Sequence, residues 1–291
     1  TTSSTSPERI SSELFQEKLK TLSRKVNLLV VDEAHCISQW GNDFRRDYRL
    51  IADIRDAIPQ VQVIAVTASA TAAVVADICE QLHFRKGYRI FKTSFERKNL
   101  SFVVRKTDNK LKEICHILSA VPGSAVIYSR TRKGVEEYAG KLRAAGISAE
   151  YFHAGLDPVL KTERQTNWVK GFTRVLVATN AFGMGIDKGD VRVVIHTEFP
   201  DSMEAYYQEA GRAGRDGKRA YAVALLGPQD ITDIKRRPSN AFPTVEYIKR
   251  VYEALCNRFQ IAEGDGEGVS VYLDEPEFLR SWHFDKGRLR S

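Results

Sequence analysis

The chain has 291 residues, 43% of them hydrophobic and 28% charged, which is the balance of a globular protein rather than of a disordered or fibrous one. No apolar run reaches the roughly 18 to 20 residues that a membrane-spanning helix needs and no signal peptide is visible, so we expect neither a membrane partner nor secretion. The net charge of +7 is compatible with a polyanionic partner but does not identify one.

Five short apolar runs rich in β-branched residues predict the buried strands of parallel sheets. They lie at 26–31, 61–66, 125–128, 174–178 and 191–195. Segments with a helical pattern follow several of them, such as 132–145, which has Gly146 as its C-terminal stop, and 158–170. Alternating strands and helices predict α/β units.

The alternation is interrupted at 91–99 and then resumes, which indicates a domain boundary there. We therefore predict a first domain over 1–92, a second over 93–228 and an extension over 229–291. In the extension, an amphipathic helix at 245–259 precedes a glycine-rich turn at 264–268. With short apolar stretches on both sides of that turn, a helix and a hairpin would make a small winged-helix-like module.

The segment D-E-A-H at 32–35 follows directly after the first apolar run. Ligand sites in α/β sheets lie at the carboxyl ends of parallel strands, so two carboxylates at this position suit chemistry on a phosphate. Asp32 would hold Mg²⁺ through water, and Glu33 would orient or deprotonate the water that attacks a γ-phosphate. An acidic helix cap after a strand is the other interpretation of these four residues.

The segment 35–48 is rich in aromatic residues and arginine. Aromatic rings stack unpaired bases at roughly 1 to 3 kcal/mol each, and arginine pairs with phosphate, so Trp40, Phe44 and Arg45 are candidates for nucleic-acid contacts. The alternative is that Phe44 and Tyr48, four residues apart, form one buried helix face. We favour that alternative for Tyr48 and base stacking for Trp40.

These segments resemble motif II and the aromatic-rich loop of the RecQ helicases, which belong to superfamily 2. Two further resemblances lie in the first domain. The segment 6–9 resembles motif Ib, which implies backbone contacts to nucleic acid by Ser6 and Arg9. The segment 67–71 resembles motif III, with Ser69 where the family usually has threonine, and implies coupling between the nucleotide and DNA sites; its hydroxyls also suit ordinary helix caps.

The second domain continues the resemblance in the family's order. The segment 128–132 resembles motif IV and assigns Arg130 to DNA; 151–155 resembles the family's Y-H-A-G strand end. The segment 178–187 resembles motif V. There the resemblance implies phosphate contacts by Thr179, Gly183 and Gly185, with Asp187 facing the nucleotide, because glycine lets a backbone approach a ligand closely.

The segment 206–217 contains Q-x-x-G-R-x-G-R and resembles motif VI. Gln208 would contact the nucleotide. Arg212 and Arg215 lie three residues apart, on one face if the segment is helical, and would neutralise charge on the γ-phosphate. We expect Arg215 to be the arginine finger and Arg212 its partner, with Asp32, Glu33 and His35 completing the catalytic set. A solvated basic turn is the alternative for G-R-A-G-R alone.

Two family features are missing from the sequence. No G-x-x-x-x-G-K-[ST] phosphate-binding loop occurs, and in RecQ proteins this loop lies upstream of motif Ib, near which this chain begins. We therefore expect a truncated chain that turns over no ATP by itself. The four cysteines lie far apart, which suggests reduced thiols and predicts neither a disulfide framework nor the family's zinc module.

The resemblance implies two RecA-like parallel-sheet lobes, the first of them truncated, with ATP and Mg²⁺ as cofactors of the full-length protein. It also implies a 3′ to 5′ helicase acting on single-stranded and duplex DNA in recombination and repair, in the cytoplasm or the nucleus. Two alternatives stay open. One is an RNA helicase of D-E-A-D type, against which stand His35 and the loop around Trp40; the other is a non-catalytic nucleic-acid-binding module.

Overall fold

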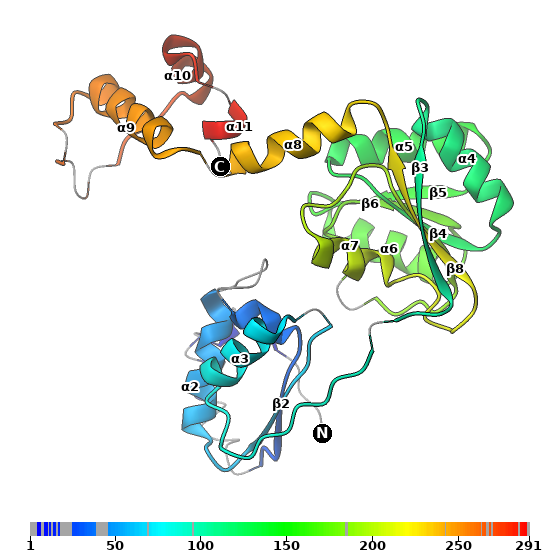
Figure 1. The fold of residues 1–291 in the computed structure, drawn as a ribbon, viewed down its shortest axis with the longest axis horizontal. Coiled ribbons are helices and arrows are strands. Elements are labelled where there is room, and N and C mark those ends of the chain that lie inside the picture. The colour runs from blue at the N-terminus through cyan, green and yellow to red at the C-terminus, as the bar shows by residue number, and fades with distance from the viewer. Residues whose placement is uncertain are drawn as a thin grey trace. The chain divides into compact units, whose positions relative to one another are not determined.

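The computed structural model of the chain describes residues 5–6, 9–10, 12, 14–15, 17, 25–38, 46–68, 70–94, 96–183, 186–241, 243–262, 264–265, 268, 270–284 and 286–289. Two compact units make up the chain (Figure 1). The first unit contains residues 1–100 and 200–219, and the second contains 101–199 and 220–291.

The first unit is built on two parallel strands, β1 (Leu28–Val31) and β2 (Gln62–Ala65), so both strands end at the same edge. These strands lie within two of the runs predicted from the sequence. Between and after them run the helical elements η2 (Ala34–Ile37), η3 (Arg46–Arg49), α2 (Leu50–Ala57) and α3 (Ala72–Gln81).

The core of the first unit is apolar and lies between the helices and one face of the sheet. Ile37, Ile58 and Leu82 are almost completely buried in it. Tyr48 is buried in the same cluster, which confirms the interpretation of this residue as part of a packed face. Helix α7 (Met203–Ala210) also belongs to this unit and is capped by Ser202, whose hydroxyl accepts a hydrogen bond from the Ala205 amide.

The second unit contains a six-stranded sheet (Figure 1). Its strands are ordered β3 (Leu100–Lys106), β8 (Ala220–Leu226), β7 (Val191–His196), β4 (Ser124–Tyr128), β6 (Val175–Ala178) and β5 (Ala149–Phe152). The five neighbours from β8 to β5 all pair in parallel. Because parallel strands must be joined by crossovers, helices α5 (Arg132–Ala144), α6 (Pro158–Val169) and α7 lie between these five strands in the chain, and α4 (Lys110–Ala120) lies between β3 and β4.

Strands β4 and β6 in the middle of this sheet are buried along their whole length, as their continuous apolar sequences predict. Helices α4 and α5 contribute Ile114, Leu118 and Leu142 to the core against one face. Gly146 has a φ of 77° just beyond α5, so the expected glycine stop is confirmed.

The C-terminal extension is helical in the part of the chain that the structure describes. It contains α8 (Asp230–Ala241), α9 (Val245–Phe259), α10 (Glu275–Trp282) and α11 (Lys286–Leu289), with a small core around Ala254, Phe278 and Phe284. The expected hairpin is wrong for the described residues of 260–274, none of which is in a strand. Leu273 instead packs against the helical cluster. None of the described helices combines the length and apolar character that crossing a membrane requires.

Candidate functional site

The carboxylates of the D-E-A-H segment lie at the edge of the first sheet where β1 ends. Asp32 is exposed, and its Oδ1 accepts a hydrogen bond from the Glu33 amide at 2.9 Å. Glu33 adopts the left-handed conformation, with φ of 48°, which is uncommon for a residue with a side chain and is found at turns and functional sites. This turn presents two carboxylates next to each other, and exposed carboxylate oxygens suit a hydrated Mg²⁺ ion.

His35 joins this segment to the end of β2. Its Nδ1 lies 3.0 Å from Thr67 Oγ1 and 3.4 Å from Glu33 Oε2. The parallel register pairs Val31 with Ala65, and the Ala34 amide donates to the Val66 carbonyl at 3.0 Å. The segments that resemble motifs II and III are therefore in direct contact, through the His35–Thr67 side-chain hydrogen bond and the Ala34–Val66 backbone hydrogen bond.

A second polar contact anchors Ser38, the residue directly after η2. The Ser38 hydroxyl is completely buried and donates to Asp77 Oδ2 of α3 at 2.5 Å, and the Gln81 amide group donates to Asp77 Oδ1 at 3.2 Å. The sequence analysis did not single out Asp77. The signal available was an acidic residue directly before the buried Ile78 of this helix.

The two arginines that resemble the family's finger pair follow α7 rather than lying in it. Helix α7 ends at Ala210, and Gly214 and Gly217 adopt φ of 63° and 79°, so the chain turns there. Arg212 and Arg215 would share a face only in a helical segment, and they lie beyond the end of α7. Arg212 is half-buried and Arg215 is exposed.

Two side chains from the segment before β3 hold the backbone of this turn. The Arg97 guanidinium donates to the carbonyls of Ala213 at 3.1 Å and Gly214 at 2.7 Å. Asn99 Nδ2 donates to Gly214 O at 2.7 Å and to Lys218 O at 2.9 Å. Sequence reasoning placed a domain boundary in this segment and missed both residues.

In the second unit, three predicted site segments meet at the carboxyl ends of neighbouring strands. Tyr128 of β4 and Phe152 of β5 both pair with Ala178 of β6. The backbone continues this contact past the strands, since the Ser129 amide donates to Ala178 O at 2.9 Å and the Thr179 amide to Phe152 O at 3.1 Å. The segments that resemble motif IV, Y-H-A-G and motif V therefore form one edge.

The candidate side chains on this edge differ in exposure. Arg130 and Asp187 are exposed, whereas Thr179 is buried and its hydroxyl accepts a weak hydrogen bond from the Ala181 amide at 3.4 Å. Phe182 of the same loop is buried, and its carbonyl accepts a hydrogen bond from the Tyr128 hydroxyl at 3.0 Å. The loop after β6 is thus anchored by the buried Phe182 and its contact with Tyr128, while Asp187 further along is exposed.

Two glycines permit close packing at this edge, and the sequence analysis singled out only one of their segments. A Cβ at Gly155 would come within 2.8 Å of the Arg132 guanidinium, and one at Gly134 would come equally close to the hydroxyls of Ser129 and Thr131. Arg132 is exposed beside the loop after β5, so this edge carries two exposed arginines, Arg130 and Arg132.

Several predicted site residues lie outside the described residues. They are Trp40, Phe44, Arg45, Ser69 and Gly185. Ser6 and Arg9 are described and exposed, and the Arg9 amide donates to the Ser6 carbonyl at 3.1 Å. Gln208 is half-buried in α7.

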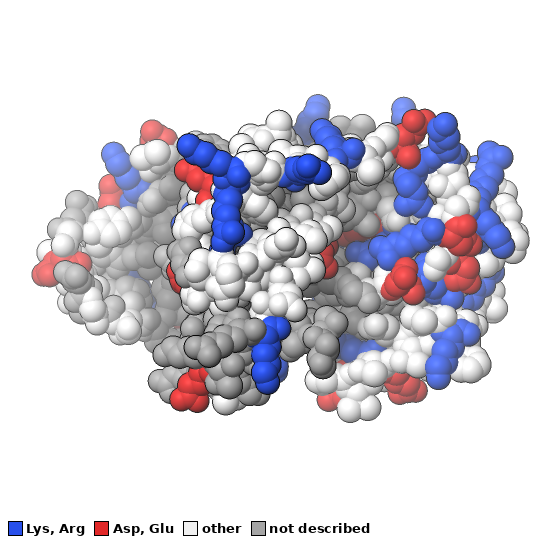
Figure 2. Space-filling model, turned by 90° about the horizontal axis from the view of Figure 1, so that it is seen from below, with Lys and Arg blue, Asp and Glu red and all other residues white. Residues whose placement is uncertain are grey.

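The net charge of +7 does not show which part of the surface binds a polyanionic partner. On the face drawn in Figure 2, lysine and arginine side chains recur across the surface with acidic side chains among them. The strand-end geometry therefore localises the candidate sites better than the net charge does.

Comparisons with known proteins match both parts of the chain. Residues 3–78 match the DEAD/DEAH box helicase family, and residues 109–217 match the helicase conserved C-terminal domain. The ATP-dependent DNA helicase RecQ of Bacillus subtilis is 42% identical over 227 residues, which are 77% of this chain and 38% of that protein. A putative ATP-dependent RNA helicase of Acanthamoeba polyphaga mimivirus is 44% identical over 214 residues, 73% of this chain and 39% of that protein.

The chain therefore spans about two fifths of the length of these two relatives. Among solved structures, Saccharomyces cerevisiae Dbp5 bound to RNA and ADP BeF3 aligns with a TM-score of 0.59 at 18% identity, covering 78% of this chain and 62% of that one. At this identity the likeness concerns the fold, and it agrees with the expected RecA-like parallel-sheet lobes.

Proposed function

Because this chain belongs to the RecQ family of superfamily-2 helicases, we propose that it is part of an ATP-dependent enzyme that unwinds duplex DNA with 3′ to 5′ polarity. Roles in recombination and repair, in the cytoplasm or the nucleus, follow from the same resemblance. The observation that carries the proposal is the strand-end site in which Asp32 and Glu33 lie beside the His35–Thr67 contact.

In this proposal the two carboxylates have different tasks. Asp32 is exposed and would hold the ion through water, while Glu33, 3.4 Å from His35, would orient the attacking water. Mg²⁺, when bound, would neutralise charge on the β- and γ-phosphates. His35 would carry changes at Glu33 to Thr67 and the segment that follows β2, because it contacts both side chains.

The arginines after α7 would supply positive charge to the transferred phosphoryl group. Arg215 is exposed and would be the finger, with Arg212 beside it in the turn that Arg97 and Asn99 hold. A turn held through its carbonyls would fix the backbone from which the two arginine side chains extend, and electrostatic stabilisation of a transition state needs charged groups that are placed in advance. Gln208 and Asp187 would contact the nucleotide.

The edge of the second sheet would bind a single DNA strand. Arg130 and Arg132 offer guanidinium groups to phosphates, and the backbone of the loops after β4 and β6 approaches the same edge. In the first unit, Ser6 and Arg9 would contact the backbone, and Trp40, Phe44 and Arg45 would stack bases and pair a phosphate.

The experiment is ATP turnover in Mg²⁺, with and without single-stranded DNA, by this chain and by a protein extended upstream. We expect none by this chain, which contains no G-x-x-x-x-G-K-[ST] loop, and DNA-stimulated turnover by the extended protein. Glu33→Gln should abolish that turnover, while Glu80→Gln, which makes the same change at an exposed position of α3, should not. Turnover that survives Glu33→Gln would remove Glu33 from its proposed role.

An RNA helicase is the second candidate, and the mimivirus relative with that name supports it. Comparing the stimulation of the extended protein by single-stranded DNA and by RNA of the same sequence separates the two. A clear preference for RNA would overturn the assignment to DNA. An extended protein that binds DNA and never hydrolyses ATP would instead indicate a non-catalytic binding module.

A further inference from the structure

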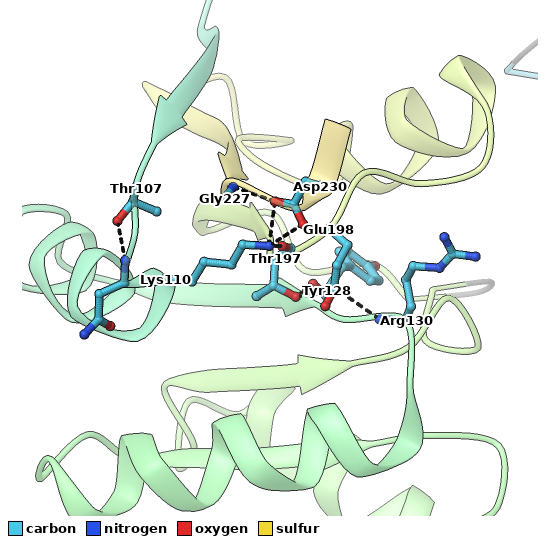
Figure 3. A network of polar contacts seen from close by, with 9 residues as sticks. Thr107, Lys110, Tyr128, Arg130, Thr197, Glu198, Gly227 and Asp230 are labelled. Carbon is cyan, nitrogen blue, oxygen red and sulfur yellow. Dashed lines mark hydrogen bonds and ion pairs between the residues drawn. The ribbon is translucent and has the colours of Figure 1, made fainter. Parts of the chain in front are cut away.

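A network of polar contacts runs through the second unit from the start of α8 to the segment that carries Arg130 (Figure 3). At one end, Asp230 is the first residue of α8, and its carboxylate lies 2.7 and 2.9 Å from Lys110 Nζ at the start of α4. Both side chains are largely buried, at 12% and 18% exposure. A pair this well shielded from water is less screened than a surface pair.

Lys110 also contacts Thr197, the residue that follows β7. Its Nζ donates to the Thr197 carbonyl at 2.5 Å, and its side chain extends toward Thr197 and Asp230 in Figure 3. Gly227 leaves room for this arrangement, since a Cβ there would come within 3.1 Å of Lys110 Cε. The Gly227 amide also donates to Asp230 Oδ2 at 2.6 Å, which orients the carboxylate.

Thr197 connects the network to β4. It is completely buried, its amide donates to the Tyr128 carbonyl at 2.9 Å, and its hydroxyl lies 3.0 Å from that carbonyl and 2.8 Å from Glu198 Oε2. Glu198 Oε2 in turn accepts a hydrogen bond from the Arg130 amide at 3.2 Å. The guanidinium of Arg130 points away from these contacts in Figure 3.

We propose that Glu198, Lys110 and Asp230 are positioning residues that hold the backbone at Arg130, so that its guanidinium is directed at a DNA phosphate. The inference rests on the proposed DNA binding by Arg130. Glu198 fixes the amide directly. Lys110 fixes the carbonyl of the neighbouring Thr197, and Asp230 anchors Lys110, so the start of the C-terminal extension is connected to a DNA-binding segment.

The chain offers a matched control for this network. Lys141 lines the same hollow of about 530 Å³ as Lys110, at the other end of α5 from Arg132. Lys141 pairs with Glu137 one helical turn away, with both side chains about half exposed, and takes no part in the contacts just described. Lys141→Met and Lys110→Met therefore remove the same charge from the same hollow, but only the second breaks the network.

The test measures the affinity of the chain for fluorescent single-stranded DNA over a series of salt concentrations. Arg130→Ala should weaken binding about fivefold and lower the salt dependence by about 0.7 in log–log slope, the loss of one phosphate contact. Glu198→Ala should have the same two effects. Lys110→Met and Asp230→Asn should have smaller effects in the same direction, and Lys141→Met should leave the slope within about 0.2 of the unsubstituted chain.

A double-mutant cycle separates positioning from a general structural effect. If Glu198 acts through Arg130, the double variant should bind about fivefold more weakly than the unsubstituted chain, whereas independent effects would multiply to about 25-fold. Glu198→Gln keeps an acceptor oxygen and should restore part of the affinity, which also covers the case in which Glu198→Ala fails to fold. Hydrogen exchange at the Arg130 amide should rise in Glu198→Ala.

The outcomes distinguish the two proposals. If the unsubstituted chain binds no single-stranded DNA, the proposed DNA binding and the positioning role both fail. If it binds DNA and Arg130→Ala weakens the binding, but Glu198→Ala and Lys110→Met behave like Lys141→Met, the positioning role alone is overturned. Multiplicative losses in the double variant would overturn it as well.

Discussion

The two sheets of the chain use similar apolar strands and bury them to different extents. In the first unit, Leu28 and Val30 of β1 and Ile64 of β2 keep about half of their side chains exposed, at 46%, 55% and 48%. In the second unit, every residue of β4 and β6 is buried. The difference lies in what covers the faces of each sheet: exposed and more buried residues alternate along β1 and β2, so one face is open among the described residues, whereas both faces are covered at β4 and β6.

The comparison shows that a strand sequence does not determine how much stability the strand contributes. Burial of an aliphatic side chain stabilises a fold by about 1.5 to 3 kcal/mol when it is complete, and proportionally less when it is partial. We therefore expect the second unit to derive its stability from its sheet. The first unit depends more on the helices that pack on the other face and on polar anchors.

Substituting isoleucine by alanine in each sheet tests this comparison most strongly. Ile127→Ala in β4 removes a completely buried side chain and should lower the free energy of unfolding of the second unit by about 2 to 5 kcal/mol. Ile64→Ala in β2 makes the same chemical change at a half-exposed position and should cost about 1 kcal/mol or less. Urea unfolding, followed by hydrogen exchange of each sheet, measures both.

Equal costs for Ile127→Ala and Ile64→Ala would contradict the comparison, since they would mean that the exposed face of the first sheet is covered in solution. A second copy of the chain is then the simplest cover, and sedimentation at several protein concentrations would detect it.

The polar anchor of the first unit provides a second test. Ser38→Ala removes the donor to Asp77 and leaves that carboxylate without its buried partner, so we expect a loss of about 1 to 3 kcal/mol in the first unit. Ser119→Ala is the control, because Ser119 is exposed and its hydroxyl donates to the nearby His116 carbonyl of the same helix; it should cost about 0.5 kcal/mol or less. A loss below that of the control would show that the first unit does not depend on this anchor.

The smallest expected effect concerns pH and belongs to the second unit. Burial, followed by the charges of Glu198, Glu137 and Asp230, raises the pKa of Tyr138 to about 12 from its ordinary value of 10.0. The folded state therefore holds this proton more tightly than the unfolded state. The resulting stability is complete below pH 10.0 and is lost as the pH rises toward about 12.

Tyr138→Phe should flatten the alkaline decline of stability in this pH range, as measured by unfolding at a series of pH values. Tyr206→Phe is the comparison within the first unit, where burial also raises the pKa of the tyrosine. An unchanged decline in Tyr138→Phe would show that other groups cause the alkaline loss.

Much of the α/β architecture could be predicted from the sequence, because buried parallel strands have a continuous apolar pattern. Each of the five predicted runs overlaps a strand, and the helix at 245–259 has the predicted bounds. Strands β3, β5 and β8 lie outside those runs, although the Y-H-A-G segment marked the end of β5. Strand β3 is an edge strand with polar and exposed positions, and small alanines take up much of β8.

The candidate sites were predictable where several residues of a motif lie at a strand end. His35 and Thr67 come from two such ends, and the parallel register brings them together. The Arg97 and Asn99 contacts could not be predicted, because both side chains bind carbonyl groups that every residue has. These contacts therefore require no particular side chains in residues 211–218, and no residue pattern there indicates them.

Because Arg97 and Asn99 bind backbone carbonyls, the turn at 211–218 can be exchanged with that of a relative in a chimeric protein. A chimera that joins two helicases between residues 99 and 100 takes Arg97 and Asn99 from one parent and the turn at 211–218 from the other. Because both side chains donate to backbone carbonyls, these contacts should survive whatever side chains the turn carries, provided that glycine stays at 214, where φ is 63°. A junction at this point should therefore be tolerated as well as one placed after residue 92.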